Sequence, residues 1–177
     1  MDRPSESAMP TTIFMQETRP PVKLICIHSS DPRCQFPIGR GRNIQKRGGV
    51  FSVPYEEFVG VFQTDFTQEM LRKRIYIVLD GLTDDERAQF GVLYGENEVL
   101  TDEGMFDFFF TGPVGDAAKA LAALCPQHQQ MVARRFVDAS LGEGKHAGSL
   151  TRERVEALYD AAEDKRLFHQ LRQSFNV

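Results

Sequence analysis

The sequence predicts an α+β fold, in which a small N-terminal β-sheet carries a long basic inter-strand loop and is covered by C-terminal helices. Two observations favour this class. Segments that are rich in β-branched and aromatic residues gather in the first half, whereas helix caps and stripes with a period of 3.6 residues dominate the last third. The 177 residues, 41% of them hydrophobic, can bury the core of one domain. We expect three regions: an extended N-terminal arm over residues 1–21, an α+β core over residues 22–112 with the basic loop at residues 32–49, and a C-terminal helical region over residues 113–177.

The first 21 residues are polar and rich in proline, which is typical of an extended arm. Ile13, Phe14 and Met15 form an apolar patch within it. Two interpretations stay open. The segment is either a disordered tail, or an arm that becomes ordered when this patch docks on a neighbouring subunit.

Two segments predict paired strands. Val22–His28 (VKLICIH) is rich in β-branched residues and apolar on both faces, and Pro and Ser residues bound it. A strand that is apolar on both faces belongs at the centre of a sheet or between layers. Gly49–Val53 (GVFSV) predicts a second strand that pairs with the first, with the basic segment as an excursion between them. We expect a short helix over Thr67–Lys73 and then a strand over Arg74–Asp80.

Caps and apolar stripes predict the helices. After Pro54, apolar residues recur at positions i, i+3, i+4 and i+7 from Tyr55, which indicates a short helix. Thr83 and Glu86 have the spacing of a capping box and should open a helix that reaches about Tyr94. In the last third we expect, in order, a helix over Ala117–Cys125 capped by Asp116, a helix that Pro126 opens and that runs through Gln127–Ser140, a flexible hinge over Leu141–Ser149, and a last helix capped by Thr151.

The apolar stripes of this last helix change face across Glu163–Arg166. Either the helix bends there, or its two halves face different surfaces. An aromatic cluster, GMFDFFFTG, lies upstream at Gly104–Gly112. It favours a place in the core, but Phe106 and Phe109 are also candidates for a partner-facing patch, because its large side chains cannot all point one way.

The most unusual stretch is Asp31–Pro54, which carries no acidic residue after Asp31. The rest of the chain is acidic, since 25 Asp and Glu outnumber 21 Lys and Arg overall. Flanking glycines allow close approach to an anionic surface, where guanidinium groups make forked hydrogen bonds. Phe36 lies among the cations and is a candidate for stacking on bases. The cations of the stretch are Arg33, Arg40, Arg42, Lys46 and Arg47.

Three interpretations of this basic loop stay open. It is a solvated surface loop, a site for an acidic protein patch, or a contact for nucleic acid. The acidic body favours a protein partner, including a second copy of the chain, because a basic loop complements acidic faces in an oligomer.

Catalytic and cofactor signatures are absent from the sequence. The pattern G-x-S-x-G does not occur, and no Lys-Ser or Lys-Thr follows the glycines as a phosphate-binding loop requires. Cys125 and His128 have a spacing seen in zinc sites, but no CxxC pair accompanies them. Three cysteines without framework spacing indicate no disulfide scaffold. We therefore expect no enzyme activity, no metal and no cofactor.

The strand Val22–His28, the Gly/Arg-rich loop and the strand running through Pro54 into a helix resemble small modules of bacteriophage virion proteins. The resemblance implies a role in assembly. We predict a structural or adaptor protein with protein partners, including a homo-oligomer. The alternative is a nucleic-acid-binding accessory protein that uses the basic loop, and an enzyme with a composite site is the third possibility.

The start of the chain lacks the apolar core of a signal peptide, and no apolar run reaches the ~20 residues that cross a bilayer. We expect no membrane contact and a location in a cytoplasm, or in a virion if the protein comes from a phage.

Overall fold

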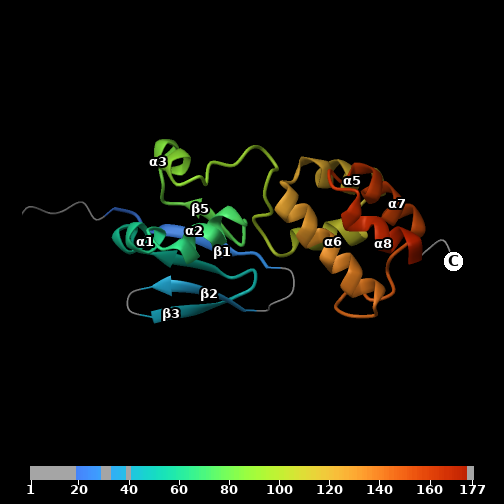
Figure 1. Ribbon diagram of the computed structural model, residues 1–177, viewed down its shortest axis with the longest axis horizontal. Helices are drawn as coiled ribbons and strands as arrows, with labels where there is room; N and C mark the ends of the chain where they lie inside the picture. Colours follow the sequence, from blue (N-terminus) through green and yellow to red (C-terminus); the bar gives the residue numbers. More distant parts are fainter. Residues whose placement is uncertain (1–18, 29–32, 39–40, 175–177) are drawn as a thin grey trace, which may run out of the picture.

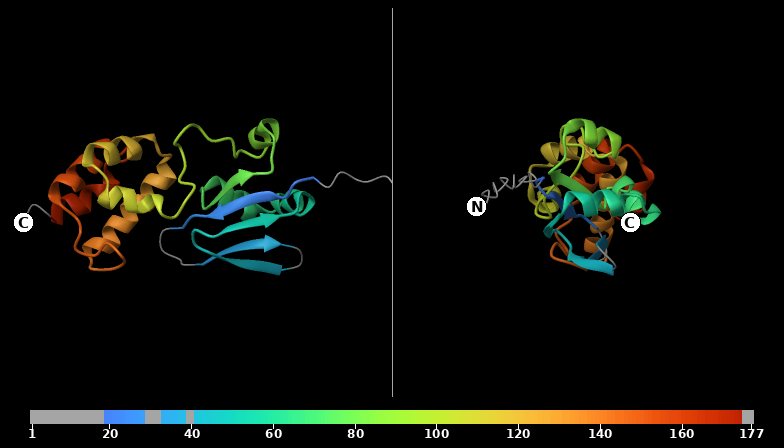
Figure 2. Two further views of the ribbon diagram at one scale, coloured as in Figure 1. Left: turned by 180° about the vertical axis from the view of Figure 1, so that it is seen from behind. Right: turned by 90° about the vertical axis from the view of Figure 1, so that its left-hand side faces the viewer.

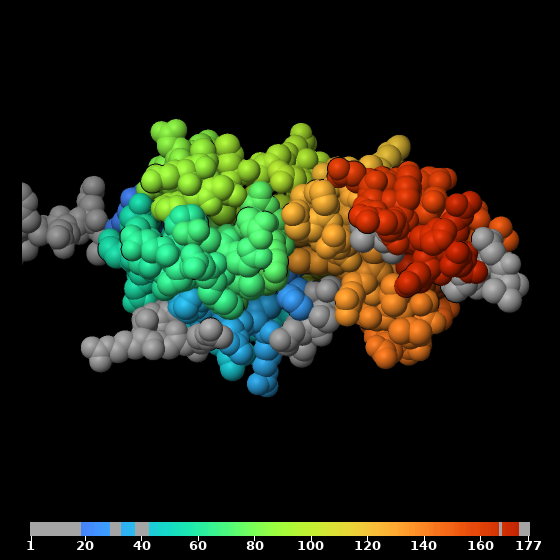
Figure 3. Space-filling view, in the orientation of Figure 1, coloured from blue at the N-terminus to red at the C-terminus, as the bar shows by residue number. Residues whose placement is uncertain are grey.

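The computed structural model describes residues 19–28, 33–38 and 41–174. It confirms the α+β class, with a small antiparallel sheet and several helices. Figures 1 and 2 show an elongated molecule whose strands lie in the N-terminal half, while most of the helices form a separate group in the C-terminal half. Figure 3 shows the two halves in contact along their shared boundary.

Three strands form the central sheet in the order β4-β1-β5, and all neighbours are antiparallel. The predicted pairing of the first two strands is confirmed, because Val22 faces Val53 and Ile25 faces Val50 across β1 and β4. The central position of β1 is confirmed as well, and four of its five residues are buried. The strands of this sheet are β1 (Val22–Cys26), β4 (Val50–Val53) and β5 (Tyr76–Asp80).

The basic segment forms a β-hairpin of its own, which was not predicted. Its strands are β2 (Arg33–Ile38) and β3 (Gly41–Lys46), and they pair from Arg33 opposite Lys46 to Ile38 opposite Gly41. Residues 39 and 40 stand between the two strands in the sequence. Figure 1 shows β3 as the outermost strand on its side of the molecule.

A disulfide fastens this hairpin to the central sheet. It joins Cys26 at the end of β1 to Cys34 in β2, whose Cα atoms are 6.3 Å apart. The cysteine count gave no sign of it, because the pairing depends on β2 folding back over β1. Cys125, the third cysteine, is a buried free thiol, and burial raises its pKa.

Short helices follow the strands in the N-terminal half. The stripe predicted after Pro54 forms α1, and the helix predicted at Thr67–Lys73 begins two residues earlier, after the cap Thr64. The capping box of Thr83 and Glu86 is present. Its helix ends at Gln89 rather than near Tyr94, because Gly91 adopts a φ of +67° that ordinary helical residues avoid. These helices are α1 (Tyr55–Phe62), α2 (Asp65–Arg72) and α3 (Asp84–Gln89).

The C-terminal half is helical as predicted, with two corrections. Pro113 precedes the first turn of α5, so Asp116 lies within that turn and is not its cap. The last helical region consists of two helices, because Ala162 is extended and ends α7. Pro126 and Thr151 start their helices as expected. The helices are α4 (Met105–Thr111), α5 (Val114–Ala123), α6 (Pro126–Ser140), α7 (Arg152–Ala161) and α8 (Arg166–Ser174).

Two apolar clusters hold the molecule together. One lies between the sheet, the hairpin and the first helices, and includes Leu24 of β1, Phe58 of α1 and Leu71 of α2. The other lies among α4–α8 and reaches the opposite face of the sheet at Ile25 and Ile77. The division of the chain at residue 112 stays a prediction. No helix in the described part of the chain has the length and apolar character that crossing a bilayer requires.

Candidate functional site

The hairpin β2–β3 separates its polar and apolar residues onto two faces. Side chains alternate along a strand, so Cys34 and Phe36 share one face of β2, and both are buried. Arg33 and Gln35 lie on the other face and are exposed. The predicted cation Lys46 faces Arg33 directly across the ladder and is exposed as well. The hairpin therefore presents a basic outer face over an apolar inner face.

Phe36 belongs to the core rather than to this basic face. Its ring is fully buried and makes edge contacts with Phe51 at 5.4 Å and with Tyr76 at 4.9 Å between ring centroids. Phe36 stands among the cations in the sequence. Successive residues of a strand point to opposite faces, however, so its ring lies on the face away from Arg33 and Lys46. A buried ring does not stack on a base.

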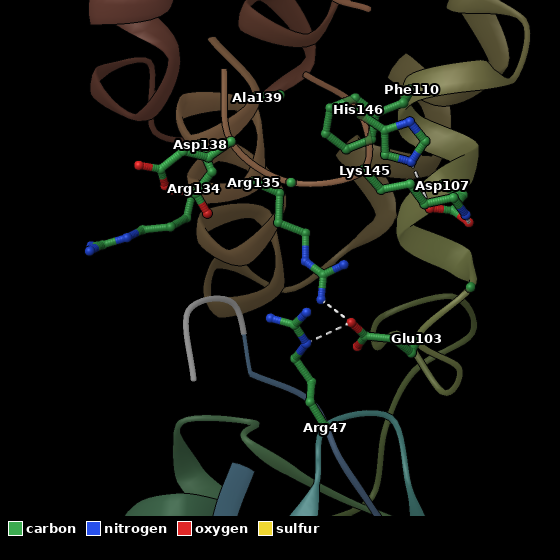
Figure 4. Close-up of a pocket in the computed structure, with 13 residues that line it drawn as sticks. Arg47, Glu103, Asp107, Phe110, Arg134, Arg135, Asp138, Ala139, Lys145 and His146 are labelled. Carbon is green, nitrogen blue, oxygen red and sulfur yellow. Dashed lines mark hydrogen bonds and ion pairs between the residues drawn. The ribbon is translucent and has the colours of Figure 1, made fainter. Parts of the chain in front are cut away.

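Arg47 is the cation whose contacts are clearest. Its Nε lies 2.9 Å from Oε1 of Glu103, and Arg135 of α6 pairs with the same carboxylate oxygen (Figure 4). The Arg135 guanidinium also lies over the ring of Phe106, 3.5 Å from its centroid, and burial lowers its pKa. A side chain added at Gly48, whose φ is +72°, would collide with Glu103. Arg47 thus connects the hairpin to the C-terminal helices.

The remaining predicted cations divide between two situations. Arg40 lies outside the described residues, as do Ile13, Phe14 and Met15 of the arm. Arg42 is part of β3, but its side chain is not among those described.

A cavity of about 620 Å³ lies beside the Glu103 ion pairs. Within it His146 Nε2 is 2.7 Å from Oδ1 of Asp107, and the imidazole stacks on Phe110 with 4.3 Å between ring centroids (Figure 4). The hydrogen bond from Lys145, and to a smaller extent the one from His146, lowers the pKa of the Asp107 carboxyl group. None of the described residues lining the cavity is Ser, Thr or Cys. The arrangement fastens the turns of residues 141–149 to α4 and places no nucleophile beside the imidazole.

The possible metal ligands of the sequence have other roles. Cys26 and Cys34 form the disulfide. Nδ1 of His128 accepts a hydrogen bond from the Leu100 N–H at 2.7 Å, and its Nε2 lies 2.9 Å from the Arg74 carbonyl oxygen. Within the described residues, no three His, Cys, Asp or Glu side chains gather as a metal site requires.

The outer edge of β5 is closed by side chains. The Val78 N–H donates to the Tyr94 hydroxyl at 3.2 Å, and Arg87 donates to the carbonyl oxygens of Val78 and Leu79 at 3.1 and 3.0 Å. These bonds occupy the backbone groups that another strand would need. The sequence marks Arg87 only as the residue after a capping box, so this role was not predicted.

The outer edge of β3 is different. Antiparallel partners alternate between hydrogen-bonded and non-hydrogen-bonded pairs. Pro37 has no N–H, so its pair with Arg42 fits the non-hydrogen-bonded class, and the register places Ile44 opposite Gln35 in the same class. The N–H and C=O of Ile44 therefore point away from β2. In the described part of the chain, β3 pairs with β2 alone.

The aromatic cluster turns its predicted residues inward. Phe106 and Phe109 are 1% and 2% exposed, since they lie on the face of α4 that meets the C-terminal core. Met105 and Phe108, on the other side of α4, are 40% and 39% exposed. They border an apolar pocket of about 440 Å³ between α4 and α5.

The chain matches no protein-family model, no curated protein and no solved structure. The function is therefore proposed from the hairpin, the strand edges and the pockets of the described residues.

Proposed function

We propose that the protein is a non-enzymatic structural or adaptor protein that assembles with protein partners. Its hairpin β2–β3 receives an extended, acidic segment of a partner as an added strand along β3. One observation carries this proposal. The N–H and C=O of Ile44 point away from β2, whereas Arg87 and Tyr94 occupy the backbone groups at the outer edge of β5. Exposed edges pair readily with foreign strands, and main-chain hydrogen bonds supply the affinity.

The charges of the hairpin support an acidic partner. Lys46 faces Arg33 across the ladder, and its side chain is exposed on the outer face of the hairpin. A carboxylate on an added strand would lie close to the Lys46 ammonium group. Ile44, which lies two residues from Lys46 on the same face of β3 and is 56% exposed, offers an apolar contact beside this ammonium group. An extended segment that alternates acidic and apolar residues fits this face.

Nucleic acid binding is the second candidate, and one observation favours it. A cavity of about 590 Å³ between α2 and α6 is bordered by Arg72, Lys73 and Arg134, and none of its described lining residues is acidic. Two facts favour the protein partner. Phe36 is buried, and an open strand edge is matched by a polypeptide backbone rather than by phosphates.

The remaining parts of the proposal rest on the sequence. The location is a cytoplasm or, as the resemblance to phage virion modules implies, a virion. An enzyme with a composite site is the third possibility, and the ion pairs around Glu103 give it no support because these groups pair with one another.

Fluorescence anisotropy tests the proposal with a labelled peptide of alternating Glu and Val residues. The full chain should bind it, and a peptide of alternating Lys and Val residues should not bind. Ile44→Pro removes the outward N–H and should weaken binding at least about tenfold, whereas Ile44→Ala, which keeps the N–H, should weaken it less. Lys46→Glu should weaken binding and make it less dependent on salt. Tighter binding of a single-stranded oligonucleotide than of the Glu-Val peptide would favour the second candidate.

A further inference from the structure

The pocket between α4 and α5 has the character of a protein-docking groove. Met105 and Phe108 form its exposed apolar wall, and Ala120 and Leu124 are among the residues of its floor. Asp116 and Lys119 stand at its rim. Exposed aromatic and methionine side chains beside a concave apolar surface are typical of places where a partner inserts a large apolar side chain.

We propose that this groove binds the apolar patch Ile13–Met15 from the arm of a second copy of the chain. The inference rests on the proposed assembly function and names its partner. Within residues 1–18, which lie outside the described part, Ile13, Phe14 and Met15 are the one run of consecutive large apolar residues. The arm thus carries one apolar patch, and the groove offers one apolar surface of the kind on which such a patch packs.

The position of Arg19, the residue next to the arm in the sequence, favours the groove of a second copy over the groove of the same chain. Arg19, the first described residue, pairs with Glu86 of α3, and its guanidinium lies 3.6 Å from the centroid of the Tyr55 ring of α1. Figures 1 and 2 place α1 and α3 toward one end of the molecule and α5 toward the other. The segment from Ile13 to Arg19 spans at most about 22 Å when fully extended. A short tether fixed at the far end presents the patch to a neighbour.

The charges beside the patch agree with this pairing. Glu17 follows Met15 by two residues, and Lys119 at the rim of the groove is 85% exposed. The ion pair of Lys119 with Asp116 is long, at 3.9 Å, so the ammonium is accessible to a carboxylate of the arm.

Such a contact joins two different surfaces, the arm of one copy and the groove of the next. A contact of this kind is heterologous, and it produces a ring if the rotation closes and an open chain of copies if it does not. The full chain should therefore form either a closed ring of fixed size or a series of oligomers that grows with protein concentration.

Complementation between two full-length variants tests this geometry by sedimentation velocity. Phe14→Asp disables the arm and keeps the groove, whereas Ala120→Arg fills the groove and keeps the arm. Each variant alone should be monomeric, and a mixture should form a one-to-one complex that does not grow further. Met105→Glu, at an exposed position of the groove wall, is a second groove variant that leaves α5 unchanged. Leu141→Asp replaces a 71%-exposed apolar residue elsewhere and should oligomerise like the unaltered chain.

Three results would overturn the inference: a monomeric unaltered chain at all concentrations, oligomers of Phe14→Asp alone, or a mixture that stays monomeric. The proposed function is tested separately at β3. Binding of the Glu-Val peptide with no arm exchange would reject this inference alone, and arm exchange without peptide binding would reject the β3 proposal alone.

Discussion

Acidification should destabilise this protein through one buried histidine. His128 has no exposed surface and connects three parts of the chain, because its ring bonds to the Leu100 N–H and to the Arg74 carbonyl oxygen. Nδ1 accepts and Nε2 donates, so the imidazole is neutral. Burial, assisted by the nearby charge of Arg74, lowers the pKa of His128 to about 4, although the bond to the Arg74 carbonyl and the charge of Glu98 oppose it.

The sign of the effect follows from proton uptake. Between pH 4 and 6.5 the unfolded chain protonates this imidazole and the folded chain does not, so protons favour unfolding. The contribution of His128 to the free energy of unfolding is therefore highest above pH 6.5, falls as the pH is lowered, and changes no further below pH 4. A folded pKa of about 4 against 6.5 corresponds to about 3 kcal/mol, of which about 2 kcal/mol is lost between pH 7.5 and pH 5.

Urea denaturation followed by circular dichroism measures this loss. The unaltered chain should lose about 2 kcal/mol between pH 7.5 and pH 5. His128→Gln, whose amide can accept and donate in place of the ring, should be less stable at pH 7.5 by about 1 kcal/mol but should lack most of the pH dependence. His169→Gln makes the same exchange at an exposed position and should retain the full loss. Equal stability of the unaltered chain at the two pH values, or an undiminished loss in His128→Gln, would refute the reasoning.

Three further substitutions or treatments have expected outcomes in urea denaturation at neutral pH. Glu103→Gln leaves the half-buried Arg135 without its carboxylate and should cost roughly 1–3 kcal/mol, and an unchanged midpoint would contradict the connecting role of this residue. Reduction of the Cys26–Cys34 disulfide opens a short loop and should cost about 2 kcal/mol, whereas a Cys34→Ser variant should not respond to the reductant. Arg154→Met removes hydrogen bonds to two carbonyl oxygens at the end of α4 and should cost roughly 1–3 kcal/mol, while Arg154→Lys should recover part of it.

Local patterns predicted the central sheet and most of the helix starts. The strand Val22–His28 could be placed at the centre of the sheet because it is apolar on both faces, and Thr83 and Thr151 could be recognised as caps from their own positions. Each of these features depends on residues that are close in the sequence. The extent of α3 was misjudged, because the positive φ of Gly91 ends this helix before Tyr94.

Long-range pairings could not be predicted in the same way. The Cys26–Cys34 disulfide and the Arg47–Glu103 ion pair require the hairpin to fold back on the sheet and the helical half to meet it. The hairpin itself had a readable signal, since polar and apolar residues alternate along β2, but its glycines and cations favoured a loop. The sequence could not show that Phe108 rather than Phe109 is exposed, because this depends on which face of α4 meets the core.

The structure places the side chains of the basic stretch in two kinds of surroundings. Arg47 points into the molecule and pairs with Glu103, so its loss should affect stability before it affects binding. Lys46, its neighbour, is exposed on the outer face of β3 opposite Arg33, so its loss should affect binding before stability. We therefore expect different roles for these adjacent residues, stability for Arg47 and the proposed partner binding for Lys46. A substitution that removed the whole run at once would confuse the two, and the variants Arg47→Met and Lys46→Glu, compared singly, separate them.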